Sequence, residues 1–403
     1  MKVAFVNARY APNEFGGAER IVRILAESLA ERGHQVCAIS ISHTGVAAEG
    51  ELNGVKTYYV PLANIFDPWK KRQDPARRAL WHLIDAYNPV MGYRVGKILD
   101  KEKPDLVDTS NLIGFSVAVW RAARKRNIPV VQALHDYYLG CPNSCMLRGG
   151  KNCAKQCGVC RVYGLPRRAL SNIPSAVVSV SDRTLRRLEQ CGLFSEVRTK
   201  TVIHGIGNAT ERPPERDTSA TEGPLVVGFL GRIEPTKGLD ILLDAAREAK
   251  NVRVLVGGSG AKDYVAGLEQ RYASERVEFA GYVRPDEFFR RIDVLALPSI
   301  WEEPLPRVIY EAYAYGVPVI IPRAGGMPEI VEQDRTGFIV TPGDRRELTE
   351  LLNRLSSEWS SSRFFDACVE KSKEFNTEQR FGKFYDVWAG AVASSLAPAE
   401  AAE

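Results

Sequence analysis

Strand-like apolar runs and helical patterns alternate along this chain in two series. The first series starts with Lys2–Asn7 and closes with 201–203, and the second starts with 225–230 and extends to 338–340. Strands alternating with helices predict parallel sheets covered by helices. The stretch 208–223 has adjacent prolines and no apolar periodicity, which predicts a linker. The fold class is therefore α/β, with two Rossmann-like, doubly wound parallel-sheet domains.

The length agrees with this division, because 403 residues with 45% hydrophobic positions are ample for two buried cores. The tail is rich in Ala, Ser and Glu, a composition typical of disorder. We predict these parts: an N-terminal domain 1–207 with a Cys-rich loop 141–160, the linker 208–223, a C-terminal domain 224–375, a helix 376–391 and a disordered tail 392–403.

Two absences suggest where the protein works. We find no run of about 18 apolar residues, so no membrane-spanning helix is expected. The first residues reach the polar Asn7 too early for a secretory signal. We therefore expect a cytoplasmic protein.

Charge is distributed unevenly between the two halves. Residues 1–208 hold 30 Lys and Arg against 17 Asp and Glu, whereas residues 209–403 hold 24 against 32. A basic half joined to an acidic half suggests that the two meet different surfaces, with nucleic acid and an anionic membrane as candidates for the basic one. A solvated surface without a partner is the alternative.

Five of the eight cysteines fall within twenty residues. They are Cys141, Cys145, Cys153, Cys157 and Cys160. In a chain without an export signal, such clustering favours a metal or redox chemistry over structural disulfides. Only the final Cys-x-x-Cys has a spacing typical of zinc ligands. A structural zinc, an iron–sulfur cluster, and unliganded or oxidised thiols all stay open.

Residues that follow predicted strands of the C-terminal domain suit an anionic ligand. Arg232 follows one strand and Lys237 opens the next helix, so a planar fork, a point charge and a helix start would meet a diphosphate together. Gly258 lies in a glycine-rich turn after the next strand. The run Gly325-Gly326-Met327 places amides before another predicted helix. Solvated cations and ordinary glycine turns are the alternative.

Glu303 and Glu311 form the sharpest feature of the sequence. Eight residues span about two helical turns, so both carboxylates can face one side, with Glu303 at the junction of a loop and the helix 305–315 and Glu311 inside that helix. A buried pair of acceptors suits hydroxyl groups, as on a sugar and a ribose. A solvated helix face is the alternative, but the neighbouring residues are largely apolar.

Together these motifs resemble the retaining GT-B glycosyltransferases of family 4, also called glycosyl transferases group 1. The N-terminal Gly16-Gly17-Ala18-Glu19 and His135-Asp136 match the same family in order and spacing. The resemblance covers nearly the whole chain. It implies two Rossmann-like domains with an interdomain cleft, and a closing helix that returns to the N-terminal domain.

The resemblance also implies a role for each matching residue. Arg232 and Lys237 would hold the diphosphate of a nucleotide sugar, a UDP- or GDP-sugar. Glu311 would bind the ribose, and Glu303 the transferred sugar. His135 would contact that sugar near the anomeric centre, which makes His135 and Glu303 the candidate catalytic residues. The remaining donor contacts would come from Gly16, Gly17, Gly258, Gly325, Gly326 and Met327.

No cofactor is expected for catalysis. The sequence holds no Asp-x-Asp, so cations and helix N-termini would stabilise the departing diphosphate. Similar cysteine loops in part of the family match Cys141, Cys153, Cys157 and Cys160, which favours a structural zinc there. One departure is Leu305-Pro306 where the family usually has Phe-Gly, and Pro306 has no N–H to offer a phosphate.

The basic half contains two segments that combine cations with aromatic residues, 69–81 and 120–126. Such segments lie on anionic leaflets. We therefore expect peripheral contact with the inner face of the plasma membrane, through the N-terminal domain, and a saccharide acceptor carried on a lipid. No recognised nucleic-acid module accompanies the charge, so no nucleic-acid partner is expected.

The expected function is retaining transfer of a sugar from a nucleotide-diphosphate sugar to a saccharide acceptor, in bacterial surface polysaccharide or glycolipid synthesis. A nucleotide-sugar 2-epimerase of the same fold is one alternative. A non-catalytic nucleotide-sugar-binding protein is another. Product formation with an acceptor separates the three.

Overall fold

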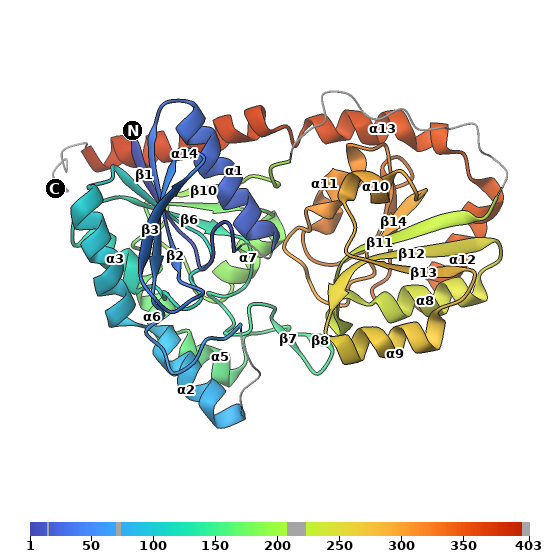
Figure 1. Ribbon diagram of the computed structural model, residues 1–403, viewed down its shortest axis with the longest axis horizontal. Coiled ribbons are helices and arrows are strands. Elements are labelled where there is room, and N and C mark those ends of the chain that lie inside the picture. Colours follow the sequence, from blue (N-terminus) through green and yellow to red (C-terminus); the bar gives the residue numbers. More distant parts are fainter. Residues whose placement is uncertain (14–15, 70–73, 208–222, 397–403) are drawn as a thin grey trace. The chain divides into compact units, whose positions relative to one another are not determined.

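The computed structural model describes residues 1–13, 16–69, 74–207 and 223–396. The chain divides into two compact units (Figure 1). Unit 1 comprises Met1–Met146, Cys153–His204 and the chain from Phe381 on, and unit 2 comprises Leu147–Asn152 and Gly205–Arg380. Apart from Gly223, the predicted linker 208–223 lies outside the described residues.

Unit 1 is built on an eight-stranded sheet with the order β10-β9-β6-β5-β1-β2-β4-β3. Its strands are β1 (Lys2–Val6), β2 (Gln35–Ile41), β3 (Ala48–Leu52), β4 (Val55–Val60), β5 (Leu106–Thr109), β6 (Val130–Leu134), β9 (Ala176–Ser179) and β10 (Thr199–Val202). Neighbouring strands are parallel except β3 and β4. The central strands are buried on both faces, as their continuous apolar runs predict.

An antiparallel hairpin, β3–β4, lies at the edge of this otherwise parallel sheet and was not predicted. Its turn is Asn53-Gly54, with φ of 49° and 75°. Asn-Gly accommodates positive φ at both central positions of a hairpin turn, so this dipeptide was the local signal for the hairpin.

Helices connect the strands of unit 1. They are α1 (Gly17–Glu31), α2 (Pro75–Ala86), α3 (Pro89–Glu102), α4 (Ala118–Arg124), α5 (Gly158–Tyr163), α6 (Leu165–Leu170) and α7 (Asp182–Glu189). Local sequence explains several starts. Asp74 precedes Pro75 and its carboxylate accepts from the N–H groups of Ala76 and Arg77, both at 3.0 Å.

The C-terminal helix α14 (Thr377–Leu396) adds to unit 1 from Phe381 on. Trp388 is fully buried there, and its indole N–H donates to Asp108 Oδ2 at 2.8 Å. The helix continues through 392–396, so the prediction of disorder from 392 is wrong for those five residues. The rest of the predicted tail, 397–403, lies outside the described residues.

Unit 2 contains a six-stranded parallel sheet with the order β13-β12-β11-β14-β15-β16. Its strands are β11 (Leu225–Ile233), β12 (Val252–Gly260), β13 (Val277–Gly281), β14 (Val294–Ala296), β15 (Val319–Pro322) and β16 (Gly337–Val340). Its helices are α8 (Leu239–Glu248), α9 (Lys262–Tyr272), α10 (Pro285–Phe289), α11 (Val308–Tyr313), α12 (Arg345–Glu358) and α13 (Ser361–Lys373), with short 3₁₀ turns η1 (Pro235–Lys237) and η2 (Met327–Glu329).

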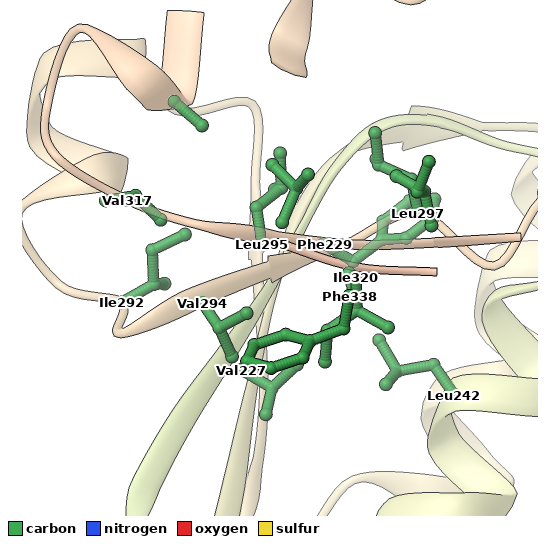
Figure 2. Close-up of a cluster of buried hydrophobic side chains, with 14 of the residues drawn as sticks. Val227, Phe229, Leu242, Ile292, Val294, Leu295, Leu297, Val317, Ile320 and Phe338 are labelled. Atoms are coloured by element: carbon green, nitrogen blue, oxygen red, sulfur yellow. The ribbon is translucent and has the colours of Figure 1, made fainter. Parts of the chain in front are cut away.

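Branched and aromatic side chains from the strands and from α8 form the core of unit 2. Figure 2 shows Val227 of β11 close to Val294 of β14, with Phe229 farther along β11 and Leu242 contributed by α8. All four are buried. This core fixes the carboxyl ends of the strands, where ligands bind in open α/β sheets.

A two-stranded hairpin, β7 (Leu147–Arg148) and β8 (Lys151–Asn152), also groups with unit 2. The sequence prediction placed the whole cysteine loop 141–160 in the first domain, which is wrong for 147–152. No helix in the described part of the chain is long and apolar enough to span a membrane.

Candidate functional site

Lys237 is held in place by the residues on either side of it. The carbonyl of Thr236 accepts from Ile300 N at 3.0 Å and from Ser299 Oγ at 3.1 Å. Gly238 has φ of 64°, and a Cβ there would lie 2.1 Å from Pro298 O. Only glycine permits this approach. The turn η1 is thereby fixed against the segment that follows β14.

Lys237 meets Glu303 across this contact. Their Nζ and Oε2 atoms lie 2.5 Å apart, and the two side chains are 17% and 7% exposed. The structure thus brings together the predicted phosphate ligand and the predicted sugar ligand. In this state each charge is satisfied by the other, as a poorly solvated pair requires.

The loop at Gly325 and Gly326 closes over the backbone of Glu303. Gly326 N donates to Glu303 O at 2.8 Å, and a Cβ on Gly325, at φ of 64°, would lie 2.0 Å from the same oxygen. The Gly326 amide is therefore already used within the protein. Met327 is fully buried in the core of unit 2, so its side chain is structural.

Asn152 of the β7–β8 hairpin fixes the segment just before Glu303. Its Nδ2 donates to Ile300 O at 3.0 Å, and its Oδ1 accepts from Glu302 N at 3.0 Å. Both ends of one amide are used, which sets the side chain and the loop in a single arrangement. Asn152 is thus a positioning residue for Glu303.

Arg232 and Gly258 differ from their predicted settings. Arg232 lies inside β11 rather than after it, is exposed, and has Nη2 at 3.5 Å from Glu234 Oε1. Gly258 lies inside β12, where a Cβ would come within 1.8 Å of Gly231 O. Close pairing of two strands therefore accounts for this glycine without a ligand.

Glu311 lies in α11, which is shorter than the predicted helix 305–315 and does not contain Glu303. Glu311 lies inside a helix as expected, whereas Glu303 lies in the loop before α11, so helical spacing does not place the two carboxylates on one face. Glu311 Oε1 pairs with Arg307 Nη2 at 3.1 Å, and Arg307 Nη1 donates to Ile206 O at 3.0 Å. Glu311, which the resemblance assigns to ribose binding, is therefore paired with Arg307.

In unit 1, His135 follows β6 and lines a pocket together with Ser110 and Asn111, which follow β5. His135 Nε2 and Ser110 Oγ are enclosed and have no hydrogen-bond partner among the described residues. Buried polar atoms are normally satisfied, so two such atoms beside a cavity of about 10 Å³ indicate a position for one small polar group, of the size of a water molecule. Ser110 and Asn111 were missed in the sequence, although their place after a strand was a signal.

Burial sets the protonation states in this pocket. It lowers the pKa of His135 to about 4, so the imidazole is neutral near pH 7. Burial also raises the pKa of Asp136 to about 6; the N–H of Tyr138, donated at 2.7 Å, opposes this, and the Glu19 carboxylate adds to it. A neutral histidine can donate from one nitrogen and accept at the other.

Gly16 and Gly17 lie where predicted, at the start of α1. Gly16 is the N-cap residue, and both glycines are exposed. A Cβ on Gly16 would lie 2.6 Å from Glu19 Oε2, a movable side chain. The helix start is therefore accessible, with Glu19 in its first turn.

The contacts among the thiols include Cys145, which was not among the predicted metal ligands. Hydrogen bonds from the Cys145 and Cys160 thiols lower the pKa of Cys141. The same contact with Cys141, together with Cys157, raises the pKa of Cys160. These contacts join Cys145 to three of the predicted ligands, Cys141, Cys157 and Cys160. Within the described ranges, no three or more His, Cys, Asp or Glu are arranged to hold a metal ion.

Burial contradicts the expected membrane contact of the tryptophans in the segments 69–81 and 120–126. Trp81 and Trp120 are 3% and 0% exposed, so neither can reach a membrane. Trp69 is partly exposed, and Arg9 stacks on its ring at 4.3 Å. Lys70, Lys71 and Arg72 lie outside the described residues.

The structure thus contains two α/β units with parallel strands, and one of them carries a Lys–Glu pair beside glycine loops. The family described as Glycosyl transferases group 1 matches residues 211–374, and Glycosyltransferase Family 4 matches residues 15–206. A Klebsiella pneumoniae protein named "Uncharacterized 42.6 kDa protein in cps region" is 33% identical, over 82% of this chain and 87% of the relative. The chain belongs to the family 4 glycosyltransferases, which use nucleotide sugars and retain the anomeric configuration without a catalytic metal.

Solved structures show the same fold. Sucrose-phosphate synthase from Thermosynechococcus elongatus has a TM-score of 0.78 at 19% identity, covering 98% of this chain and 99% of that chain. HepE from Anabaena, in complex with UDP-glucose, has a TM-score of 0.71 at 22% identity, covering 97% and 100%. The predictions of family, fold and enzyme class are confirmed.

Proposed function

We propose that this glycosyltransferase moves a sugar from a UDP- or GDP-sugar to a lipid-linked saccharide during synthesis of a bacterial surface polysaccharide or glycolipid. The observation that carries the donor side is the Lys237–Glu303 pair, locked between the Thr236–Ile300 contact and the Gly325–Gly326 loop. The proposed donor is supported by HepE, which is similar in fold and was solved in complex with UDP-glucose. The proposed polymer is supported by the Klebsiella relative, which is named for the cps region. We place the work in the cytoplasm, peripherally at the inner face of the plasma membrane.

Donor binding would exchange one ion pair for two new contacts. The diphosphate draws Lys237 away from Glu303, and the freed carboxylate accepts hydrogen bonds from hydroxyls of the transferred sugar. A nucleoside diphosphate without a sugar would leave Glu303 buried and unpaired. The exchange therefore favours the complete nucleotide sugar over the bare nucleotide.

Lys237 and Arg232 would then stabilise the charge that develops on the departing diphosphate. Retention without an enzyme nucleophile requires the acceptor to attack from the face that the diphosphate leaves. The acceptor hydroxyl proton passes to a phosphate oxygen as the glycosyl–phosphate bond breaks. His135 is neutral and contacts the sugar through a hydrogen bond, without transferring its proton.

Thermal-shift and transfer assays test this function together. Wild-type protein is heated with UDP, GDP, ADP and their sugar conjugates, and a ligand at about 100 times its dissociation constant stabilises by roughly 2.7 kcal/mol. The donor found in this way is then incubated with lipid-linked acceptors, and radiolabelled product is extracted. Binding without product would favour a non-catalytic protein, and conversion without acceptor would favour a 2-epimerase.

We also propose that the thiol cluster holds a structural metal, zinc rather than an iron–sulfur cluster, with no part in catalysis. Support comes from the mutual contacts of Cys141, Cys145, Cys157 and Cys160. Elemental analysis of wild-type, Cys145→Ser and Cys153→Ser proteins decides the ligand set. Loss of metal in either variant shows that the substituted thiol is a ligand, and wild-type protein without metal refutes the proposal.

A further inference from the structure

Large apolar side chains are exposed on three neighbouring helices of unit 1. Leu80 and Leu83 of α2 are 49% and 58% exposed, Val159 and Val162 of α5 are 61% and 59% exposed, and Leu165 at the start of α6 is 58% exposed. We call these five residues the apolar surface. Exposed apolar groups that gather in this way mark an interaction site, whereas single ones need no explanation.

The three helices are packed together, so the exposure is not that of a loose segment. Tyr163 OH of α5 donates to Ala79 O of α2 at 3.1 Å, and the rings of Tyr163 and His82 lie 5.9 Å apart. Figure 1 shows α2, α5 and α6 in the same part of unit 1. On the inner face of α2, Trp81 is buried and its indole N–H donates to Phe66 O at 2.9 Å.

The thiol cluster orients α5. Cys157 is the N-cap residue of this helix and Cys160 lies within it, and both thiols contact the cluster that includes Cys141. At about 100° per residue, Val159 and Val162 project from the side of the helix opposite to the two cysteines. Fixing the thiols therefore turns the valines outward.

Arginines accompany the apolar surface. Arg77 and Arg78 of α2 and Arg161 of α5 are exposed, and within the described part of the chain none of the three pairs with a carboxylate. The surrounding half of the chain, residues 1–208, holds 30 Lys and Arg against 17 Asp and Glu. Apolar groups beside unpaired cations complement an anionic lipid surface, where side chains enter the acyl boundary and arginines meet phosphates.

We propose that the apolar surface of α2, α5 and α6 docks unit 1 on an anionic lipid bilayer. This inference deepens the proposed function, because it gives the enzyme a way to reach an acceptor carried on a lipid. It replaces the buried Trp81 and Trp120 with five aliphatic residues as the membrane contact. Docking needs no donor, so it is tested separately from transfer.

Vesicle flotation of the full-length protein provides the test. Vesicles of phosphatidylcholine with phosphatidylglycerol are compared with phosphatidylcholine alone, at low and high salt and without nucleotide. We expect binding to the anionic vesicles only, weakened by salt. Leu80→Ser with Leu83→Ser, and separately Val159→Ser with Val162→Ser, should each lower the partition coefficient about tenfold, because each pair removes apolar contact with the bilayer.

The matched control is Val90→Ser with Tyr93→Ser, an exposed pair on α3 outside the apolar surface. The control should float like the wild type. Stabilisation by a nucleotide, measured on every variant, shows that unit 2 is folded. Wild-type protein that binds nucleotide but does not float would overturn docking and leave the transferase intact. Equal flotation of all variants would also overturn it, as would a dimer in light scattering that the Leu80 and Leu83 changes abolish.

Discussion

The two candidate sites differ in how their polar groups are satisfied. In unit 2, Lys237 and Glu303 neutralise each other at 2.5 Å. In unit 1, Ser110 Oγ and His135 Nε2 are enclosed without a partner in the described residues. A ligand must break an existing pair in the first case, but supplies a missing contact in the second. Binding in unit 2 is therefore an exchange that can discriminate between ligands.

The largest expected effect comes from removing one member of the exchanged pair. Lys237→Ala should lower nucleotide-sugar affinity and kcat/KM about 100-fold, because a charge-assisted phosphate contact is lost and Glu303 is left without a cation. Calorimetry and initial rates measure this. Lys262→Ala removes an exposed lysine at the start of α9 and should change neither quantity. Wild-type affinity in Lys237→Ala would end the idea that this pair binds the donor.

Glu303→Gln should separate two ligands that Lys237→Ala affects alike. Glutamine keeps the size of the side chain but releases the lysine, so UDP or GDP should bind at least as tightly as to the wild type. Turnover of the nucleotide sugar should fall about 30-fold, because a carboxylate acceptor for the sugar is lost. Equal losses for the nucleotide and its sugar would show that Glu303 acts only through Lys237.

Both members of the pair were predictable as site residues, but their contact with each other and the parts that hold it were not. Lys237, Glu303 and Gly325 could be selected from residue type and from their position after strands. Asn152 could not, because its contact with Ile300 spans 148 residues and begins in a two-residue strand. Nor could the length of α11 be predicted, since apolar residues on either side of a short helix continue the same periodicity.

Burial was the other quantity that the sequence left open. A tryptophan beside arginines can face the lipid or the core, and Trp81 and Trp120 face the core. The glycine run at Gly258 suggested a ligand, but strand pairing with Gly231 requires it. The alternating order of strands and helices was sufficient for the fold, because right-handed crossovers leave few arrangements of a parallel sheet.

Asn152→Ala should show how far the exchange depends on the loop before Glu303. Losing both hydrogen bonds frees the Ile300–Glu302 segment, so kcat should fall about fivefold while bare nucleotide affinity stays nearly unchanged. Asn152→Asp keeps the acceptor for Glu302 N and should recover part of the loss. If kcat is unaffected by either change, the hairpin has no positioning role.

The smallest effect concerns the pocket of unit 1 and the pH dependence of stability. The pKa of His135 is about 4 in the folded protein, against an ordinary value of 6.5. Between these two pH values the unfolded chain binds a proton at His135 and the folded protein does not. This contribution is complete above pH 6.5 and is lost as pH falls towards 4. Asp85, Asp108 and Asp136 have raised pKa values and act in the opposite direction.

Because these contributions oppose one another, the difference between two proteins is the informative quantity. The melting temperature of His135→Gln, relative to the wild type, should rise as pH is lowered from 6.5 to 4, by a few degrees at most. His43→Gln, at an exposed histidine, is the control. A pH-independent difference would mean that the pKa of His135 is the same in the folded and the unfolded protein, so that burial does not exclude the proton from this imidazole.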